Sequence, residues 1–292
     1  MSARLWKNIR SDGPKPGVMV AVLLAGLVAG FMGGMVPAAA QAQTLNFGSG
    51  GSDQPIEIFA DNGIEWQQEN LMFLARGNAR AVRGQVTVFA SELRAYYREK
   101  SDGSTDIWRL DAIGKVRIKT AGEMAYGDKA IYQVEKGILV LSGRKVRLVA
   151  GSDEITATKQ LEYWEKKQMA VARGNAYAVR KDKRLKADVL ASYFRVDKNG
   201  DNKLYRVDAF DNVKIVTQTN TATADRGVYN VESGIATLTG SVKLVRGKSI
   251  LTGCSAEVNL NTGISKIFSC PTTPGAVRKR AKGILRLQKK KP

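Results

Sequence analysis

The chain of 292 residues contains no histidine, only two cysteines, and few aromatic residues, which make up 7% of the sequence. Without histidine it lacks the commonest general base and the commonest side-chain metal ligand of proteins. The sequence also contains neither a Gly-x-Ser-x-Gly nucleophile elbow nor a phosphate-binding P-loop. We therefore expect no catalytic residue, no cofactor and no metal site, and we predict that the protein is not an enzyme.

Acidic residues are scarce relative to basic ones, 27 against 46, and the formal net charge is +19. Four basic residues precede residue 42 and eight follow residue 271, which leaves a net charge of about +8 on the part between. A basic balance favours an anionic partner. No aromatic stacking platform for nucleic acid is evident, so we expect an anionic lipid or glycolipid rather than nucleic acid.

An apolar run extends from Val18 to Val36, behind Arg4, Lys7, Arg10 and Lys15 and ahead of an alanine-rich end. This arrangement is typical of a secretory signal peptide, here residues 1–42, cleaved after Ala40 or Ala42. Since the run is nearly long enough to span a bilayer, an uncleaved membrane anchor is the alternative. Four glycines within the run and the alanines that follow it favour cleavage, and hence export.

What the sequence does contain is a repeat. An offset of 97 residues aligns Arg76–Ala79 with Arg173–Ala176, and most of the surrounding sequence aligns with it after a one-residue deletion near Lys145. Shorter units of about 30 to 37 residues lie inside each copy, a period typical of stacked repeats. Each unit is interpreted as a strand, a polar turn and a returning strand that bends or bulges at a glycine. No stretch has helical periodicity, and the predicted fold class is all-β.

Counted outward from each glycine, residues of one parity are apolar and residues of the other are polar, such as Arg109, Asp111 and Asp208. Such alternation is typical of a sheet with one face inside and one face in water. The inner residues are mostly Ala, Val and Leu, which leave room in a space about 10 Å thick. This space is either an ordinary core or an open apolar trough for acyl chains. The candidate lipid-binding residues are Phe73, Leu110, Val116, Ile118, Leu139, Leu141, Val146, Leu148, Val207, Val213, Ile215, Leu238, Val242 and Leu244.

Composition divides the remainder of the chain. Residues 43–54 contain Gly and Ser and are predicted to be a flexible lead-in. Residues 55–270 form the repeat domain. Residues 271–292 are rich in Pro, Gly and Lys without periodicity, and are predicted to be a disordered basic tail.

The segments Val228–Leu244 and Leu251–Gly263 strongly resemble the OstA-like repeat of the LptA family of periplasmic lipopolysaccharide-transport proteins. The resemblance covers roughly Pro55 to Phe268. It implies a twisted, open β-jellyroll, a folded-over sheet whose trough carries the acyl chains of lipid A. It also implies edge-to-edge assembly, through which members bridge inner-membrane and outer-membrane jellyroll partners of the transport machinery. This chain is longer than the usual member, which leaves the number of stacked layers open.

Two alternatives remain. If the leader is not cleaved, the inner-membrane-anchored jellyroll partner of the same pathway is the better match. An all-β repeat is also compatible with a β-helix polysaccharide lyase, although no cluster of acidic residues supports that function.

An open stacked sheet has unpaired strands at both ends. We expect the N-terminal edge near Ile56–Trp66 and the C-terminal edge near Glu257–Phe268, with head-to-tail self-association as one consequence.

Cys254 and Cys270 are expected to form a disulfide, because an exported chain meets an oxidising compartment. A hairpin centred on Thr262 would place Ala256 opposite Phe268 and Cys254 opposite Cys270, close enough to bridge. Two free buried thiols are the alternative.

Overall fold

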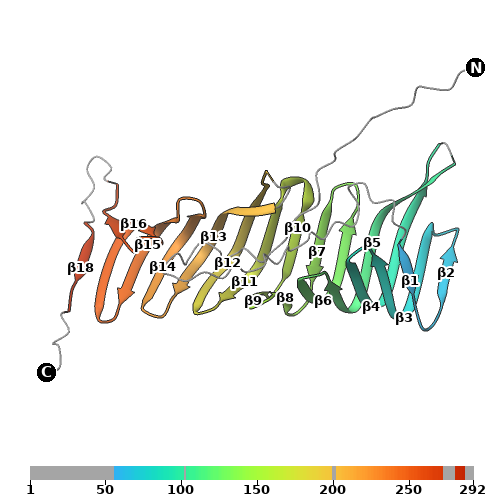
Figure 1. Ribbon diagram of the computed structural model, residues 1–292, viewed down its shortest axis with the longest axis horizontal. Coiled ribbons are helices and arrows are strands. Elements are labelled where there is room, and N and C mark those ends of the chain that lie inside the picture. Colours follow the sequence, from blue (N-terminus) through green and yellow to red (C-terminus); the bar gives the residue numbers. More distant parts are fainter. Residues whose placement is uncertain (1–55, 102, 199–201, 272–279, 287–292) are drawn as a thin grey trace, which may run out of the picture.

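The computed structural model describes residues 56–101, 103–198, 202–271 and 280–286, which form one long antiparallel sheet (Figure 1). The predicted signal peptide and the whole of the predicted flexible lead-in lie outside the described residues. The all-β prediction is confirmed, because the described residues form strands and one short 3-10 helix, η1 (Glu165–Lys167). Over the same residues, no helix has the length and apolar character needed to cross a membrane.

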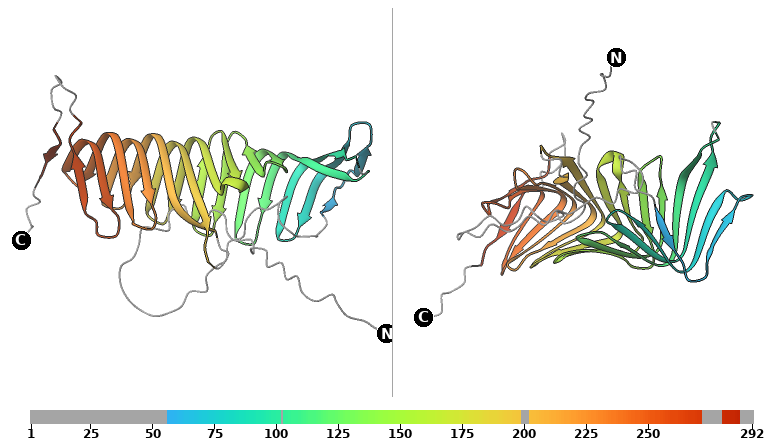
Figure 2. Two further views of the ribbon diagram at one scale, coloured as in Figure 1. Left: turned by 90° about the horizontal axis from the view of Figure 1, so that it is seen from above. Right: turned by 45° about the vertical axis from the view of Figure 1, so that its right-hand side comes forward.

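The strands follow one another along the sheet, from β1 and β2 at one end to β17 and β18 at the other (Figures 1 and 2). Most successive strands pair with each other, but four couples, β1 and β2, β7 and β8, β9 and β10, and β17 and β18, each pair side by side with one shared long strand. The bounds are β1 (Glu57–Phe59), β2 (Ile64–Gln67), β3 (Met72–Arg83), β4 (Val86–Glu99), β5 (Thr105–Lys119), β6 (Glu123–Gln133), β7 (Ile138–Ser142), β8 (Val146–Ala150), β9 (Asp153–Ala157), β10 (Gln160–Trp164), β11 (Met169–Arg180), β12 (Lys183–Val196), β13 (Asn202–Val216), β14 (Asn220–Asn230), β15 (Ile235–Arg246), β16 (Ser249–Asn259), β17 (Ser265–Phe268) and β18 (Lys282–Ile284).

The duplication is visible in the strand bounds. Strands β3 and β11 both have 12 residues, and they begin 97 residues apart, at Met72 and Met169. Strands β5 and β13 both have 15 residues and begin at Thr105 and Asn202, with the same offset. The pairing repeats as well, since Ile58 faces Ala81 on β3 and Ile155 faces Ala178 on β11.

Glycine bends the long strands as predicted. The register of β3 shifts between Arg76 and Ala79, where Gly77 has a φ of 78°. Strand β15 shifts between Thr239 and Val242, where Gly240 has a φ of 75°. Both glycines adopt the left-handed backbone region. Most residues with a side chain avoid this region for steric reasons, whereas glycine adopts it freely.

Two of the bends are not formed by a bulge at a glycine. In β13 the bulge is formed by Asp211 and Asn212, with φ values of 59° and 51°, because short polar side chains tolerate the left-handed region. At Gly143 the chain does not bulge at all. There the strand is interrupted between β7 and β8, and both pieces still pair with β6.

The bends line up along the sheet and form a crease that divides each long strand into two arms. The sheet folds over at the crease, so that residues from both arms of one strand line a single space, for example Leu238 and Leu244 of β15. The apolar inner faces of the two arms form one core cluster, which runs from Ala75 on β3 to Ala256 on β16. The molecule is thus an open, folded-over β-jellyroll (Figure 2).

The prediction of a disordered tail over residues 271–292 is wrong for residues 280–286. There, Lys282–Ile284 forms β18, which pairs with Ile250–Thr252 of β16. The backbone N–H of Arg286 also donates to the Ser249 hydroxyl, at 3.3 Å. Unpaired groups on the edge of β16 attract an extended segment even when it is too short to show alternation in sequence.

The predicted register of the last hairpin is wrong by one residue. The structure places Ser255 opposite Phe268 and Ala256 opposite Ile267. The turn has four residues, 260–263, rather than three, because the Asn259 side chain accepts hydrogen bonds from the Asn261 and Thr262 amides.

Candidate functional site

The inner face of the folded sheet carries every candidate lipid-binding residue. Alternation explains this placement, since side chains two positions apart on a strand point to the same face. Ten of the candidates are buried, and Phe73, Leu110, Ile215 and Leu244 are partly buried. The inner face also carries aromatic residues that the glycine-centred pattern missed, namely Tyr97, Tyr132, Tyr163 and Phe194. They lie on β4, β6, β10 and β12, which were not counted outward from a bend glycine, although the alternation along these strands was available as a signal.

The space between the arms divides into three sections along the trough. The section near the C-terminal end, termed the C-terminal cavity, has a volume of about 670 Å³. The N-terminal cavity has about 360 Å³. Between them lies a narrow central section of about 60 Å³, which shares Ile118 and Leu139 with the N-terminal cavity. The two larger volumes are of the size that binds small ligands in proteins.

Not all of the candidates reach this space. Val207, Ile215, Leu238 and Leu244 line the C-terminal cavity. Phe73, Leu110, Ile118 and Leu139 line the N-terminal cavity, and Leu141 and Leu148 line the central section. The remaining four, Val116, Val146, Val213 and Val242, follow the bends directly and are packed in the crease, where they are 0–2% exposed. Parity predicts the face of a residue but not its distance from the crease.

The C-terminal cavity combines an apolar wall with a basic rim. Beyond the predicted residues, its wall contains Ala222 and Tyr229 of β14 and Leu251 and Val258 of β16, which flank the bulged strand β15. The rim is formed by the turns on one side of the sheet and by the tail segment, and carries Lys183, Arg184, Arg246, Lys248 and Arg286. Burial lowers the pKa of Lys183 from its usual value. Such a surface suits an amphiphile with apolar chains and an anionic head group.

Aromatic side chains line the opposite end of the trough. Trp66 stacks on Phe73 with ring centroids 5.4 Å apart, and Phe73 contacts Tyr97 at 5.3 Å. The indole N–H of Trp66 donates to the Tyr97 hydroxyl at 2.9 Å. Trp66 is still 60% exposed. Of these rings, Phe73 lines the N-terminal cavity, and Trp66 and Tyr97 hold it from either side.

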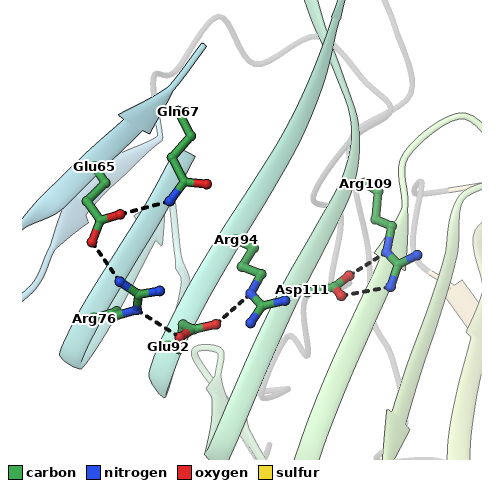
Figure 3. Close-up of polar contacts among 7 residues, drawn as sticks. All are labelled: Glu65, Gln67, Arg76, Glu92, Arg94, Arg109 and Asp111. Atoms are coloured by element: carbon green, nitrogen blue, oxygen red, sulfur yellow. Dashed lines mark hydrogen bonds and ion pairs between the residues drawn. The ribbon is translucent and has the colours of Figure 1, made fainter. Parts of the chain in front are cut away.

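The outer face is polar, as predicted from the alternation, and several of its charges are paired across strands. Arg76 of β3 contacts Glu65 of β2 at 2.6 Å and Glu92 of β4 at 3.2 Å, and Glu92 also contacts Arg94 (Figure 3). Burial raises the pKa of the Glu92 carboxyl, but hydrogen bonds from Arg94 and Arg76 outweigh burial, and the pKa is lowered from its usual value.

Two outer-face aspartates are buried, although their parity predicted exposure to water. Asp111 is 3% exposed and Asp208 is 5% exposed. Each accepts two hydrogen bonds from the arginine two residues before it, Arg109 or Arg206 (Figure 3 for the first pair). The guanidinium groups cover the carboxylates and satisfy them, which makes the pairs a structural feature of the repeat.

Cys254 and Cys270 form a disulfide in the structure, with Cα atoms 4.9 Å apart. They are not directly opposite each other, because the register differs from the predicted one, but neighbours on adjacent strands remain within reach of a disulfide. Among the described residues, no group of three or more His, Cys, Asp or Glu side chains is placed to hold a metal ion.

Comparison with known proteins places these features in a family. The sequence model described as "LptA/(LptD N-terminal domain) LPS transport protein" matches twice, over residues 57–159 and 154–264. The two matches begin 97 residues apart, which is the offset of the duplication. Together they cover most of the described chain.

Similarity to individual proteins includes the following two. The uncharacterized protein R00383 of Rhizobium meliloti (strain 1021) is 28% identical over 147 residues, which cover 48% of this chain and 78% of that protein. The crystal structure of LptH, the LptA homologous periplasmic component of the lipopolysaccharide transport device of Pseudomonas aeruginosa, matches with 11% identity and a TM-score of 0.21. That match covers 80% of this chain and 96% of LptH. The family assignment rests on the two sequence matches and not on this superposition.

Proposed function

Because this chain belongs to the LptA/LptD N-terminal domain family of LPS transport proteins, we propose that it binds lipopolysaccharide in its trough and carries it across the periplasm. The family is one of transport proteins, so membership gives no support to the polysaccharide-lyase alternative. In this proposal the acyl chains of lipid A lie between the two arms of the sheet, and the sugar and its anionic groups remain at the rim.

The observation that carries the proposal is the C-terminal cavity. Its wall is apolar on both arms, and each methylene that leaves water for such a wall contributes about 0.8 kcal/mol. Its rim presents Lys183, Arg246 and Lys248, which match the charge of an anionic head group. A polar head group would be costly to bury, so this arrangement fixes the orientation of the lipid.

The location and the partners follow from the same proposal. Cleavage of the leader after Ala40 or Ala42 would release the protein into the periplasm. The β1–β2 edge and the β16–β18 edge would pair with jellyroll domains of the inner-membrane and outer-membrane transport complexes, or with further copies of this chain. Sequencing the mature N-terminus in cells separates this protein from a membrane-anchored member of the pathway.

Binding of purified lipopolysaccharide to inner-face variants tests the function. Leu238→Asp places a carboxylate in the wall of the C-terminal cavity and is expected to reduce binding at least about tenfold, because an unpaired charge would have to be buried against acyl chains. The matched control is Thr239→Asp, which introduces the same carboxylate at the next residue of β15, on the exposed outer face. It should bind like the unmodified protein.

Since Leu238 is only 2% exposed, the aspartate could unfold β15. Leu244→Asn, at a partly buried position in the same cavity, is therefore measured alongside, together with the melting temperature of each variant. Folded Leu238 and Leu244 variants that bind lipopolysaccharide as well as the Thr239 control does would contradict binding in the trough.

A further inference from the structure

The C-terminal edge of the sheet is covered by the chain itself. Strand β16 is the last long strand, and its outer side holds two short ones (Figure 1). Strand β17 pairs with Ser255–Val258 on one arm, and β18 pairs with Ile250–Thr252 on the other. The tail thus occupies the half of the edge that β17 leaves open.

An internal comparison shows what β18 replaces. In the first copy of the repeat, Ile155 of β9 faces Ala178 on the second arm of β11. In the second copy, Leu251 occupies the place of Ile155, and it faces Gly283 of β18. The tail strand therefore stands where the next unit of the repeat would pair, if the sheet continued.

The two short strands are held with different strength. Strand β17 continues directly from β16 through a tight turn and is anchored by the Cys254–Cys270 disulfide. Strand β18 has only three residues, all exposed, and three facing pairs with β16. Two further hydrogen bonds, from the Ala281 and Arg286 amides to serine hydroxyls, flank it. Few cross-strand pairs give little stability, so β18 can detach while β17 stays in place.

The same segment reaches the end of the trough. Leu285 and Arg286, directly after β18, line the C-terminal cavity beside Leu251 of β16. Leu285 is nevertheless 75% exposed, so it is an apolar side chain laid across the end of the cavity rather than part of the core. Removal of β18 from the edge would take both residues away from the cavity.

The two ends of the molecule carry opposite charge. Residues 56–71, which contain β1 and β2, include Glu57, Asp61, Glu65 and Glu69 and no lysine or arginine. At the other end, residues 246–268 and 280–286 include one acidic residue, Glu257, against Arg246, Lys248, Lys266, Arg280, Lys282 and Arg286. Within the described chain, β1 and β2 pair only with β3, so their outer edge is open. Charge complementarity of this kind favours head-to-tail contact between copies.

We propose that β18 is a detachable cap, which occupies the Ile250–Thr252 edge of β16 until the acidic β1–β2 edge of a second copy displaces it. The same displacement moves Leu285 and Arg286 off the end of the C-terminal cavity, so that assembly and opening of the trough are one event. The proposal rests on the edge-to-edge assembly in the proposed function, and adds that this assembly is regulated by the tail.

A covalent lock tests the cap. Thr252 and Lys282 face each other, so Thr252→Cys with Lys282→Cys joins β18 to β16. The matched control, Thr252→Ser with Lys282→Ser, has the same charge and cannot form the bond. A third protein ends at Pro271 and lacks β18. Self-association of all three is measured by sedimentation under non-reducing conditions.

The locked protein is expected to associate about tenfold more weakly than the serine control, and the shortened protein about tenfold more strongly. A tenfold change is the size of effect that the loss or gain of three cross-strand pairs supports. A fluorescent acyl-chain probe should enter the C-terminal cavity most slowly in the locked protein and fastest in the shortened protein. Equal association of locked and control proteins would overturn the cap and leave edge assembly intact. If none of the three associates at any concentration, edge assembly itself is wrong, and the cap with it.

The identity of the displacing edge is tested in the shortened protein. Glu57→Lys with Glu69→Lys reverses charge on the β1–β2 end and leaves the C-terminal edge unchanged. Weaker self-association of this variant supports the head-to-tail pairing. Unchanged association would show that the copies meet through another surface and would contradict the assigned partner.

Discussion

Tyr132 and Tyr229 occupy equivalent positions in the two copies of the repeat, but their hydroxyl groups differ in environment. The Tyr132 hydroxyl donates to the Glu165 carboxylate, whose oxygens lie at 3.0 and 3.1 Å. The Tyr229 hydroxyl is buried and has no hydrogen-bond partner among the described residues. In the second copy the turn after β16 presents Asn261, where the first copy has Glu165. Burial raises the pKa of both tyrosines, and the charge of Glu165 raises that of Tyr132 further.

This difference predicts unequal effects of one substitution. Tyr132→Phe is expected to lower the free energy of unfolding by about 1–3 kcal/mol, because the Glu165 carboxylate loses a hydrogen-bond donor. Tyr229→Phe should change it by less than about 0.5 kcal/mol, since no hydrogen bond is lost. Urea denaturation of the two variants beside the unmodified protein measures both. Equal losses would show that the Tyr229 hydroxyl has a partner after all.

At the level of single residues, the sequence was sufficient to predict faces but not depth. Val242 and Leu244 have the same parity on β15, and both are inside. Val242 follows the bulge directly and is 1% exposed in the crease, whereas Leu244 lines the cavity. Distance from the crease depends on how far the two arms separate, which is a property of the folded sheet. Asp111 and Asp208 are buried although their parity places them outside, because the arginines two residues earlier on the same strands cover them.

At the level of elements, the bends were predictable and the last hairpin was not. Gly77, Gly174 and Gly240 interrupt long alternating runs, and glycine in such a run marks a bulge. The register of the β16–β17 hairpin depends instead on hydrogen bonds from amides to the Asn259 side chain, which lengthen the turn by one residue. Strand β18 was missed because its pairing depends on the unpaired edge of β16, and not on its own three residues.

The Cys254–Cys270 disulfide is predicted to form in the exported protein and to stabilise this last hairpin. Closing a loop of about 15 residues is worth roughly 3 kcal/mol in the chain-entropy model. Cys254→Ser with Cys270→Ser should therefore lower the free energy of unfolding by about that amount, mainly through fraying of the C-terminal end. Non-reducing mass spectrometry of the periplasmic protein checks the bond directly. Two free thiols, or a bond between separate chains, would contradict it.

At the level of the whole molecule, duplication has produced two unequal halves of one trough. The C-terminal cavity has about 670 Å³ and a basic rim, and the N-terminal cavity has about 360 Å³ and includes Phe73 and Tyr132 in its wall. The central section is narrow, so an acyl chain that passes from one half to the other must separate the arms there. In this section strands pair only within one arm, so the movement separates packed side chains without breaking strand pairing.

The central claim is that lipopolysaccharide lies between the two arms, and photo-crosslinking in living cells tests it most directly. A photoreactive amino acid is placed at Leu238 or Leu244 in the C-terminal cavity, at Leu141 in the central section, at Val242 in the crease, and at Thr239 on the outer face. We predict that lipopolysaccharide is captured from Leu238, Leu244 and Leu141, and that capture from Val242 and Thr239 is at background. Capture from Thr239, or none from the three trough positions in a folded, exported protein, would contradict the claim.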